Sequence, residues 1–304
     1  MRGRQVLLGG LLLGIGIVGT IFAALSSAQS LPAGYDQFES NVTIWLEGST
    51  VVVQSDAVPN HPSPYFDTLD PRYEAYNGPN PNYQQNPNHI EEQTLEFRLP
   101  ATPQVSPTHP ATPLGPIGVS LNGVPFFNQY AGPNQPLTNE INSFDQYDGH
   151  PQQTGTYHYH VEPLYLTAQF GDDALLGFLL DGYPVYGPEE NGETVTNGDL
   201  DQYHGHSHAT AEYPSGIYHY HVTAAAPYIN GTGFYGVPGT VDEQQAPTPT
   251  PAASVGGATE LPGLAPANGS GGGIVIAAAG GALLAVLAAG GWYLRRNREP
   301  GTRN

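Results

Sequence analysis

A strict alternation of tyrosine and histidine occurs twice in the chain. Residues 155–161 read GTYHYHV and residues 216–222 read GIYHYHV. Alternation with a period of two predicts a β-strand, and alternate side chains of a strand share one face. We therefore expect each copy to place two histidines on one face and two tyrosines on the other.

The region around these two copies also predicts strands rather than helices. Residues 41–53 read as two strands about a Glu47-Gly48-Ser49 turn, a β-hairpin. Residues 94–99 read as a single strand, whereas 117–127 and 175–186 each read as a strand, an Asn-Gly or Asp-Gly turn and a second short strand. No helical period extends over three turns there, and 39 Gly and 30 Pro disfavour helices.

The alternating strands belong to a longer internal repeat, with halves at about 115–173 and 174–236. Corresponding residues, at offsets of 59, 56 and 61, are Asn122 and Asp181, Asp145 and Asp201, and His158 and His219. We expect an all-β domain over 29–241, a duplicated β-sandwich-like fold with long irregular loops whose halves pack as a pseudo-symmetric pair.

These motifs resemble the YHYH domain family, which is named after the tetrapeptide. The resemblance covers residues 51–236, with further matching stretches at 55–61, 115–119 and 227–229. It implies an exported domain. It implies no activity, because none is established for the family.

The N-terminus has the layout of a secretory signal peptide over 1–28. Arg2 and Arg4 precede an apolar run over 6–25, and small residues end it at Ser26-Ser27-Ala28. The run is long for a signal peptide, so an uncleaved membrane anchor is the alternative. Either segment would export the domain that follows.

The C-terminus predicts a membrane anchor. Residues 242–273 are rich in Pro, Ala, Gly and Thr and predict an extended stalk. Residues 274–294 are apolar or small over the length of a transmembrane helix, and Arg residues follow in the tail 295–304. We expect a single-pass protein of the cell membrane, with an extracellular domain and a cytoplasmic C-terminus.

The charge and composition of this region limit the classes of partner that the domain can bind. Between residues 29 and 270 lie two Arg and 26 acidic residues, a formal charge of 2 − 26 = −24. Such a field concentrates cations and repels nucleic acid, so we expect metal ions and no nucleic-acid partner. An adaptation to salty or acidic surroundings would give the same charge. The absence of Cys excludes thiolate ligands and a Cys nucleophile.

The histidines of the repeat have the spacing of a transition-metal site. Residues i and i+2 of a strand are about 6.6 Å apart, and each half adds a Gly-His upstream. Three imidazoles per half suit copper or zinc. The predicted ligands are His150, His158, His160, His206, His219 and His221, with His61, His204 and Asp201 as candidate helpers. The sequence leaves open one pooled site or two, and whether either is catalytic.

Two interpretations therefore follow from the sequence. The first is a membrane-tethered extracellular protein that binds copper or zinc through the duplicated histidines, with a metalloenzyme as one form of it. The second is a non-catalytic surface module that binds glycan or protein through Tyr- and Asn-rich loops. In the second, the Tyr-His strands would be structural ladders, stabilised by cross-strand pairs and by hydrogen bonds from His to backbone carbonyls.

Overall fold

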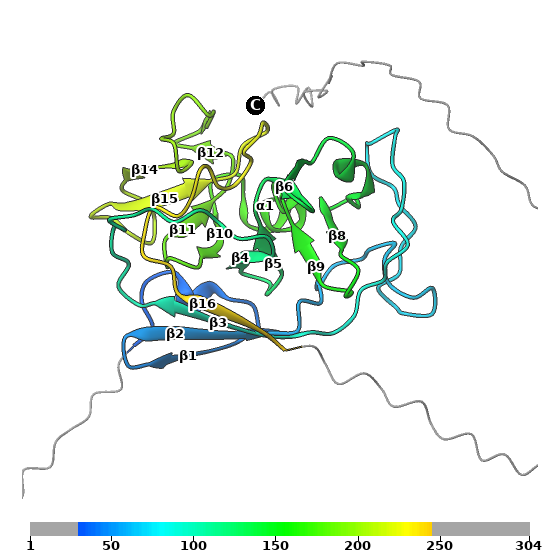
Figure 1. Cartoon of the computed structure of the whole chain (residues 1–304), viewed down its shortest axis with the longest axis horizontal. Coiled ribbons are helices and arrows are strands. Elements are labelled where there is room, and N and C mark those ends of the chain that lie inside the picture. The colour runs from blue at the N-terminus through cyan, green and yellow to red at the C-terminus, as the bar shows by residue number, and fades with distance from the viewer. Residues whose placement is uncertain (1–29, 245–304) are drawn as a thin grey trace, which may run out of the picture. The chain divides into compact units, whose positions relative to one another are not determined.

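Two β-sheets and two small hairpins account for most of the regular structure in residues 30–244, the part of the chain that the computed structural model describes (Figure 1). The predicted signal peptide, transmembrane helix and cytoplasmic tail lie outside these residues, as does all of the predicted stalk beyond Gln244. Within residues 30–244 no helix is long and apolar enough to cross a membrane.

The smaller sheet has four antiparallel strands in the order β1-β2-β3-β16. Its strands are β1 (Thr43–Glu47), β2 (Thr50–Ser55), β3 (Thr94–Pro100) and β16 (Thr240–Gln244). β1 and β2 form the predicted hairpin, and β3 is the strand predicted at 94–99. β16 pairs with β3 and continues past residue 241, where we placed the end of the domain.

The larger sheet has eight strands in the order β14-β15-β11-β10-β4-β5-β9-β8. Their bounds are β4 (Pro116–Ser120), β5 (Pro125–Phe127), β8 (Gly149–Pro151), β9 (Tyr157–Tyr159), β10 (Leu175–Leu179), β11 (Pro184–Tyr186), β14 (Gly205–His208) and β15 (Ile217–His221). Each half of the repeat supplies four strands, and the second half mirrors the first. The two Tyr-His strands therefore lie far apart in strand order, each second from one end.

The two halves meet at the central pair of β4 with β10. Val119 pairs with Phe178, its own counterpart in the repeat at an offset of 59 residues. A local two-fold axis consequently passes between these residues. The strands approach closely because Gly118 and Gly177 face the partner backbone, and a Cβ at either glycine would collide with it.

The remaining elements are short. They are the helix α1 (Leu164–Phe170), the 3₁₀ turns η1 (Tyr35–Gln37) and η2 (Glu140–Ser143), and the hairpins β6 (Tyr130–Ala131) with β7 (Gln135–Pro136) and β12 (Glu189–Glu190) with β13 (Glu193–Thr194). One apolar core joins residues of both sheets, such as Val51 and Phe97 with Phe126 and Phe178. The prediction of an all-β domain is confirmed.

Candidate metal centres

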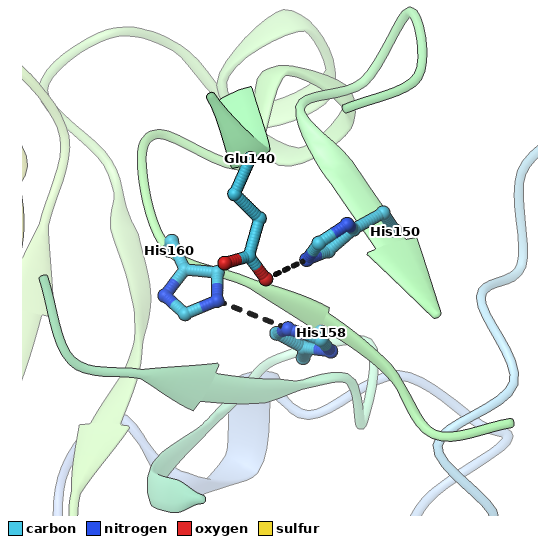
Figure 2. Close-up of side chains that lie close together, drawn as sticks. All are labelled: Glu140, His150, His158 and His160. Atoms are coloured by element: carbon cyan, nitrogen blue, oxygen red, sulfur yellow. Dashed lines mark hydrogen bonds and ion pairs between the residues drawn. The ribbon is translucent and has the colours of Figure 1, made fainter. Parts of the chain in front are cut away.

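The first group of candidate ligands lies at the β8–β9 end of the larger sheet. Figure 2 shows Glu140 from η2, His150 from β8, and His158 and His160 from β9 and the residue after it, all pointing toward one another. One ligand atom from each lies within 4.8 Å of the others. The Nε2 atoms of His158 and His160 are 3.0 Å apart, and His150 Nε2 is 3.3 Å from Glu140 Oε1.

The second group repeats this arrangement at the other end of the sheet. It consists of Glu190 from β12, His206 from β14, and His219 and His221 from β15, again with ligand atoms within 4.8 Å. His206 Nε2 and His219 Nε2 are each 3.5 Å from an oxygen of Glu190. The described residues thus form two separate groups rather than one pooled cluster of histidines.

Backbone carbonyls fix the first imidazole of each Tyr-His strand in the same way. His158 Nδ1 lies 3.0 Å from the carbonyl oxygen of Thr156, and His219 Nδ1 lies 2.9 Å from that of Ile217. In both cases the acceptor is two residues upstream. A carbonyl accepts only, so Nδ1 carries the proton and Nε2 of the neutral ring keeps its lone pair.

The second imidazole of each strand is held by a neighbouring loop. His160 Nδ1 lies 2.5 Å from the carbonyl of Asn128, and His221 Nδ1 lies 2.7 Å from that of Gly187. Asn128 and Gly187 are counterparts at an offset of 59 residues. The repeat therefore preserves the carbonyls that orient the rings as well as the rings themselves.

The Nε2 atoms that enter the groups lack hydrogen-bond partners. Those of His150, His206, His219 and His221 are buried without one. The Nε2 atoms of His158 and His160 face only each other, and both are acceptors when Nδ1 carries the proton. Buried polar atoms are rarely left unsatisfied. A proton or a cation placed among these lone pairs would satisfy them.

Burial keeps the imidazoles of His160 and His221 neutral at neutral pH. Burial, together with the neighbouring His150, lowers the pKa of His160 to about 4. Burial, with His219 and His206, likewise lowers the pKa of His221 to about 4. Neutral imidazole binds metal and imidazolium does not, so these side chains are in the ligating state at neutral pH.

The two carboxylates are held in the ionised state despite partial burial. Burial opposes ionisation of Glu140, but its interactions with His150, 3.3 Å away, and with His160 hold its pKa below the usual value. For Glu190, burial is likewise outweighed, chiefly by a hydrogen bond to His208. Each group can therefore offer three imidazole nitrogens and one anionic oxygen.

The separations between ligand atoms fit a single ion. A tetrahedral site with metal–ligand bonds of about 2.0–2.1 Å has edges of about 3.3 Å. Four of the distances between ligand atoms in the two groups run from 3.0 to 3.5 Å, and all of them are within 4.8 Å. A contraction of the longer distances would place one ion at equal distances from these atoms.

The tyrosine face of each strand is occupied by structural hydrogen bonds. Tyr157 donates to Asp145 and Tyr218 to Asp201, at 2.8 and 2.9 Å. The second tyrosine of each strand is also hydrogen-bonded. Tyr220 donates to Asp181 at 2.6 Å, and Tyr159 accepts from Asn122 at 3.3 Å. The Asn and Asp residues that recur in the repeat thus form hydrogen bonds with the tyrosines. These bonds, and those of the histidine Nδ1 atoms with backbone carbonyls, both fit the structural-ladder interpretation.

The three candidate helpers lie in neither group. His61 is buried and contacts the hydroxyl of Tyr159 through Nε2 at 2.9 Å. His204 Nε2 lies 3.0 Å from the hydroxyl of Thr223. Asp201 also accepts hydrogen bonds from backbone N–H groups of its own turn. These three residues contact a tyrosine hydroxyl, a threonine hydroxyl and turn backbone rather than the candidate ligands.

Sequence reasoning missed Glu140 and Glu190. They do not occupy corresponding positions in the repeat, since Glu140 lies ten residues before His150 and Glu190 sixteen before His206. Each comes from a different kind of element, a 3₁₀ turn and a short hairpin. In a region with many acidic residues, no local pattern distinguishes these two.

The fold and the two groups define a β-protein with a duplicated His₃Glu arrangement, and comparison with protein families agrees with the motifs. The family described as YHYH protein matches residues 96–194 and 189–234. Over these residues the chain matches the YHYH family, which confirms the resemblance predicted from the motifs. No curated protein and no solved structure matches the chain.

Proposed function

We propose that the domain binds two transition-metal ions, copper or zinc, one in each His₃Glu group. The observation that carries the proposal is the convergence of buried histidine Nε2 atoms on a carboxylate in each group, where four of the six have no hydrogen-bond partner. Imidazole-rich sites suit zinc and copper, whereas calcium and magnesium take oxygen ligands. The backbone carbonyls that face the Nδ1 atoms support the proposal, because ligating histidines usually donate their other N–H to such a group.

Three imidazoles and a carboxylate are donors that both zinc and copper accept. Zinc would take a tetrahedral geometry in each group, whereas Cu²⁺ prefers tetragonal arrangements. Zinc has no redox chemistry of its own. A zinc-loaded domain would act through structure or through Lewis-acid chemistry.

We also propose the location of the domain and the way it packs. The signal-like segment 1–28, the apolar segment 274–294 and the basic tail 295–304 support an extracellular domain tethered to the cell membrane. The core shared by the two sheets supports a β-sandwich-like packing of the duplicated domain.

Elemental analysis of the full chain, purified without a histidine tag, tests the metal proposal. We expect two equivalents of metal in the natural sequence. The double variants His158→Ala/His160→Ala and His219→Ala/His221→Ala should each retain one. His89→Ala is the matched control, because His89 is exposed and belongs to neither group. Metal-free natural protein, or two ions retained in both folded double variants, would overturn the proposal.

A further inference from the structure

A cavity of about 470 Å³ adjoins the first group. All four members of that group, Glu140, His150, His158 and His160, contribute to its lining. An ion held among them would therefore lie in the wall of a space large enough for a small organic molecule.

Apart from the four candidate ligands, the cavity lining is uncharged and combines apolar side chains, such as Leu114 and Phe127, with polar ones. Amide side chains come from Asn86, Asn88, Gln152 and Gln153, and Tyr130 supplies an aromatic hydroxyl. Besides the histidines, Glu140 is the one titratable carboxylate of the lining, and no Lys or Arg contributes to it. With no Lys or Arg side chain to pair with an anionic group, the protein part of this lining favours a neutral molecule that forms hydrogen bonds.

The corresponding side of the second group is occupied by an additional histidine. His208 follows His206 by two residues, just as Gln152 follows His150. His208 Nδ1 lies 2.8 Å from Glu190 Oε2, and its ring centroid is 4.2 Å from that of His206. The position that lines the cavity in the first half thus places an imidazole against the candidate ligands in the second half.

We propose that the two metal ions have different roles, an inference that rests on the proposed function. The ion of the first group takes a small, uncharged, hydrogen-bonding molecule from the cavity as an additional ligand. The ion of the second group is closed to exogenous ligands by His208 and serves the stability of its half. Four protein ligands leave room for this step, since zinc-type sites expand to five-coordinate.

Cobalt substitution separates the two ions in solution. The full-length double variants from the elemental analysis each carry one Co²⁺, and azide is titrated against the visible absorption of the metal. We expect azide to change the spectrum of His219→Ala/His221→Ala, which retains the first group. The spectrum of His158→Ala/His160→Ala should not change. A response in the latter variant, or none in the former, would overturn the inference.

The class of ligand is tested with a matched pair of molecules, glycolamide and glycolate, as competitors of azide in the first variant. We expect the ratio of glycolamide affinity to glycolate affinity to be at least several-fold higher for the protein than for aqueous Co²⁺. An equal or lower ratio would contradict an uncharged ligand. Failure of either variant to take up Co²⁺ would instead count against the proposed function itself, so the two failures are distinguishable.

Discussion

The Nε2 atoms of His158 and His160 lie 3.0 Å apart although Nδ1 of each ring faces a backbone carbonyl. Two lone pairs at this distance repel each other unless a positive charge lies between them. Burial, with the neighbouring His150 and His160, holds the pKa of His158 well below its usual value, so a proton is a poor solution at neutral pH. A metal ion would satisfy both nitrogens at once.

Metal binding should therefore stabilise the fold. We expect chelation to lower the free energy of unfolding, and addition of zinc at about 100 times the dissociation constant to restore about 2.7 kcal/mol per site. Denaturant unfolding with and without zinc measures the difference. The His89→Ala protein should respond as fully as the natural sequence. An unfolding midpoint that is indifferent to both chelator and zinc would show that these groups hold no ion.

Each carboxylate should affect one site only. Glu140→Gln keeps the shape of the side chain but removes the negative ligand of the first group, and we expect its metal to bind at least roughly tenfold more weakly. Glu190→Gln should weaken the second site by a similar factor. Competition against a chromophoric chelator resolves the two affinities. Equal weakening of both sites by one substitution would mean that the groups are not independent.

The tyrosine face should contribute to stability without affecting metal content. Tyr220→Phe removes the donor to buried Asp181 and the acceptor for the backbone N–H of Tyr235. We expect a loss of about 1–3 kcal/mol in the free energy of unfolding, with two metal ions still bound. Tyr73→Phe, on an exposed residue, is the control. Loss of a metal ion in folded Tyr220→Phe would indicate that the two faces of the strand act together.

His61 should make the metal-free protein sensitive to acid. Burial lowers its pKa from 6.5 to about 4 in the folded protein. Between these values the unfolded chain binds the proton and the folded chain does not, so stability is lost as the pH falls from 6.5 toward 4. One such group corresponds to on the order of 3 kcal/mol.

The variant His61→Gln should therefore lose less stability than the natural sequence between pH 7 and pH 4.5. Urea unfolding of both metal-free proteins at the two pH values measures this. Buried Asp145 and Asp181, whose pKa values burial raises to about 6, act in the opposite direction but are common to both proteins and cancel in the comparison. A difference between the proteins that does not vary with pH would exclude His61 as the titrating group.

Much of the architecture could be predicted from sequence because the two halves of the repeat carry the same motifs in the same order at nearly constant offsets. Alternation correctly separated the histidine face from the tyrosine face of each strand, as the contacts of His158 and Tyr157 show. The repeat offsets anticipated a paired arrangement, which Val119 and Phe178 complete at the centre of the larger sheet. These features depend on local periodicity, which can be read directly from the sequence.

The composition of each group could not be predicted in the same way. Glu140 and Glu190 reach corresponding places in space from positions that do not correspond in the chain. Asp201, which we predicted as a helper of the metal site, accepts hydrogen bonds from a tyrosine hydroxyl and from its own turn. It contacts no histidine of either group through these bonds. Which polar residue faces which group depends on loop geometry, and periodicity does not encode it.

The central claim is that an ion occupies each His₃Glu group, and anomalous diffraction from crystals of the untagged protein tests it most directly. Data collected on both sides of the zinc and copper absorption edges should give two peaks. One should lie among Glu140, His150, His158 and His160, and the other among Glu190, His206, His219 and His221. Crystals grown with zinc that show no anomalous peak in either group, with the imidazoles bonded instead to protein or water, would contradict the account.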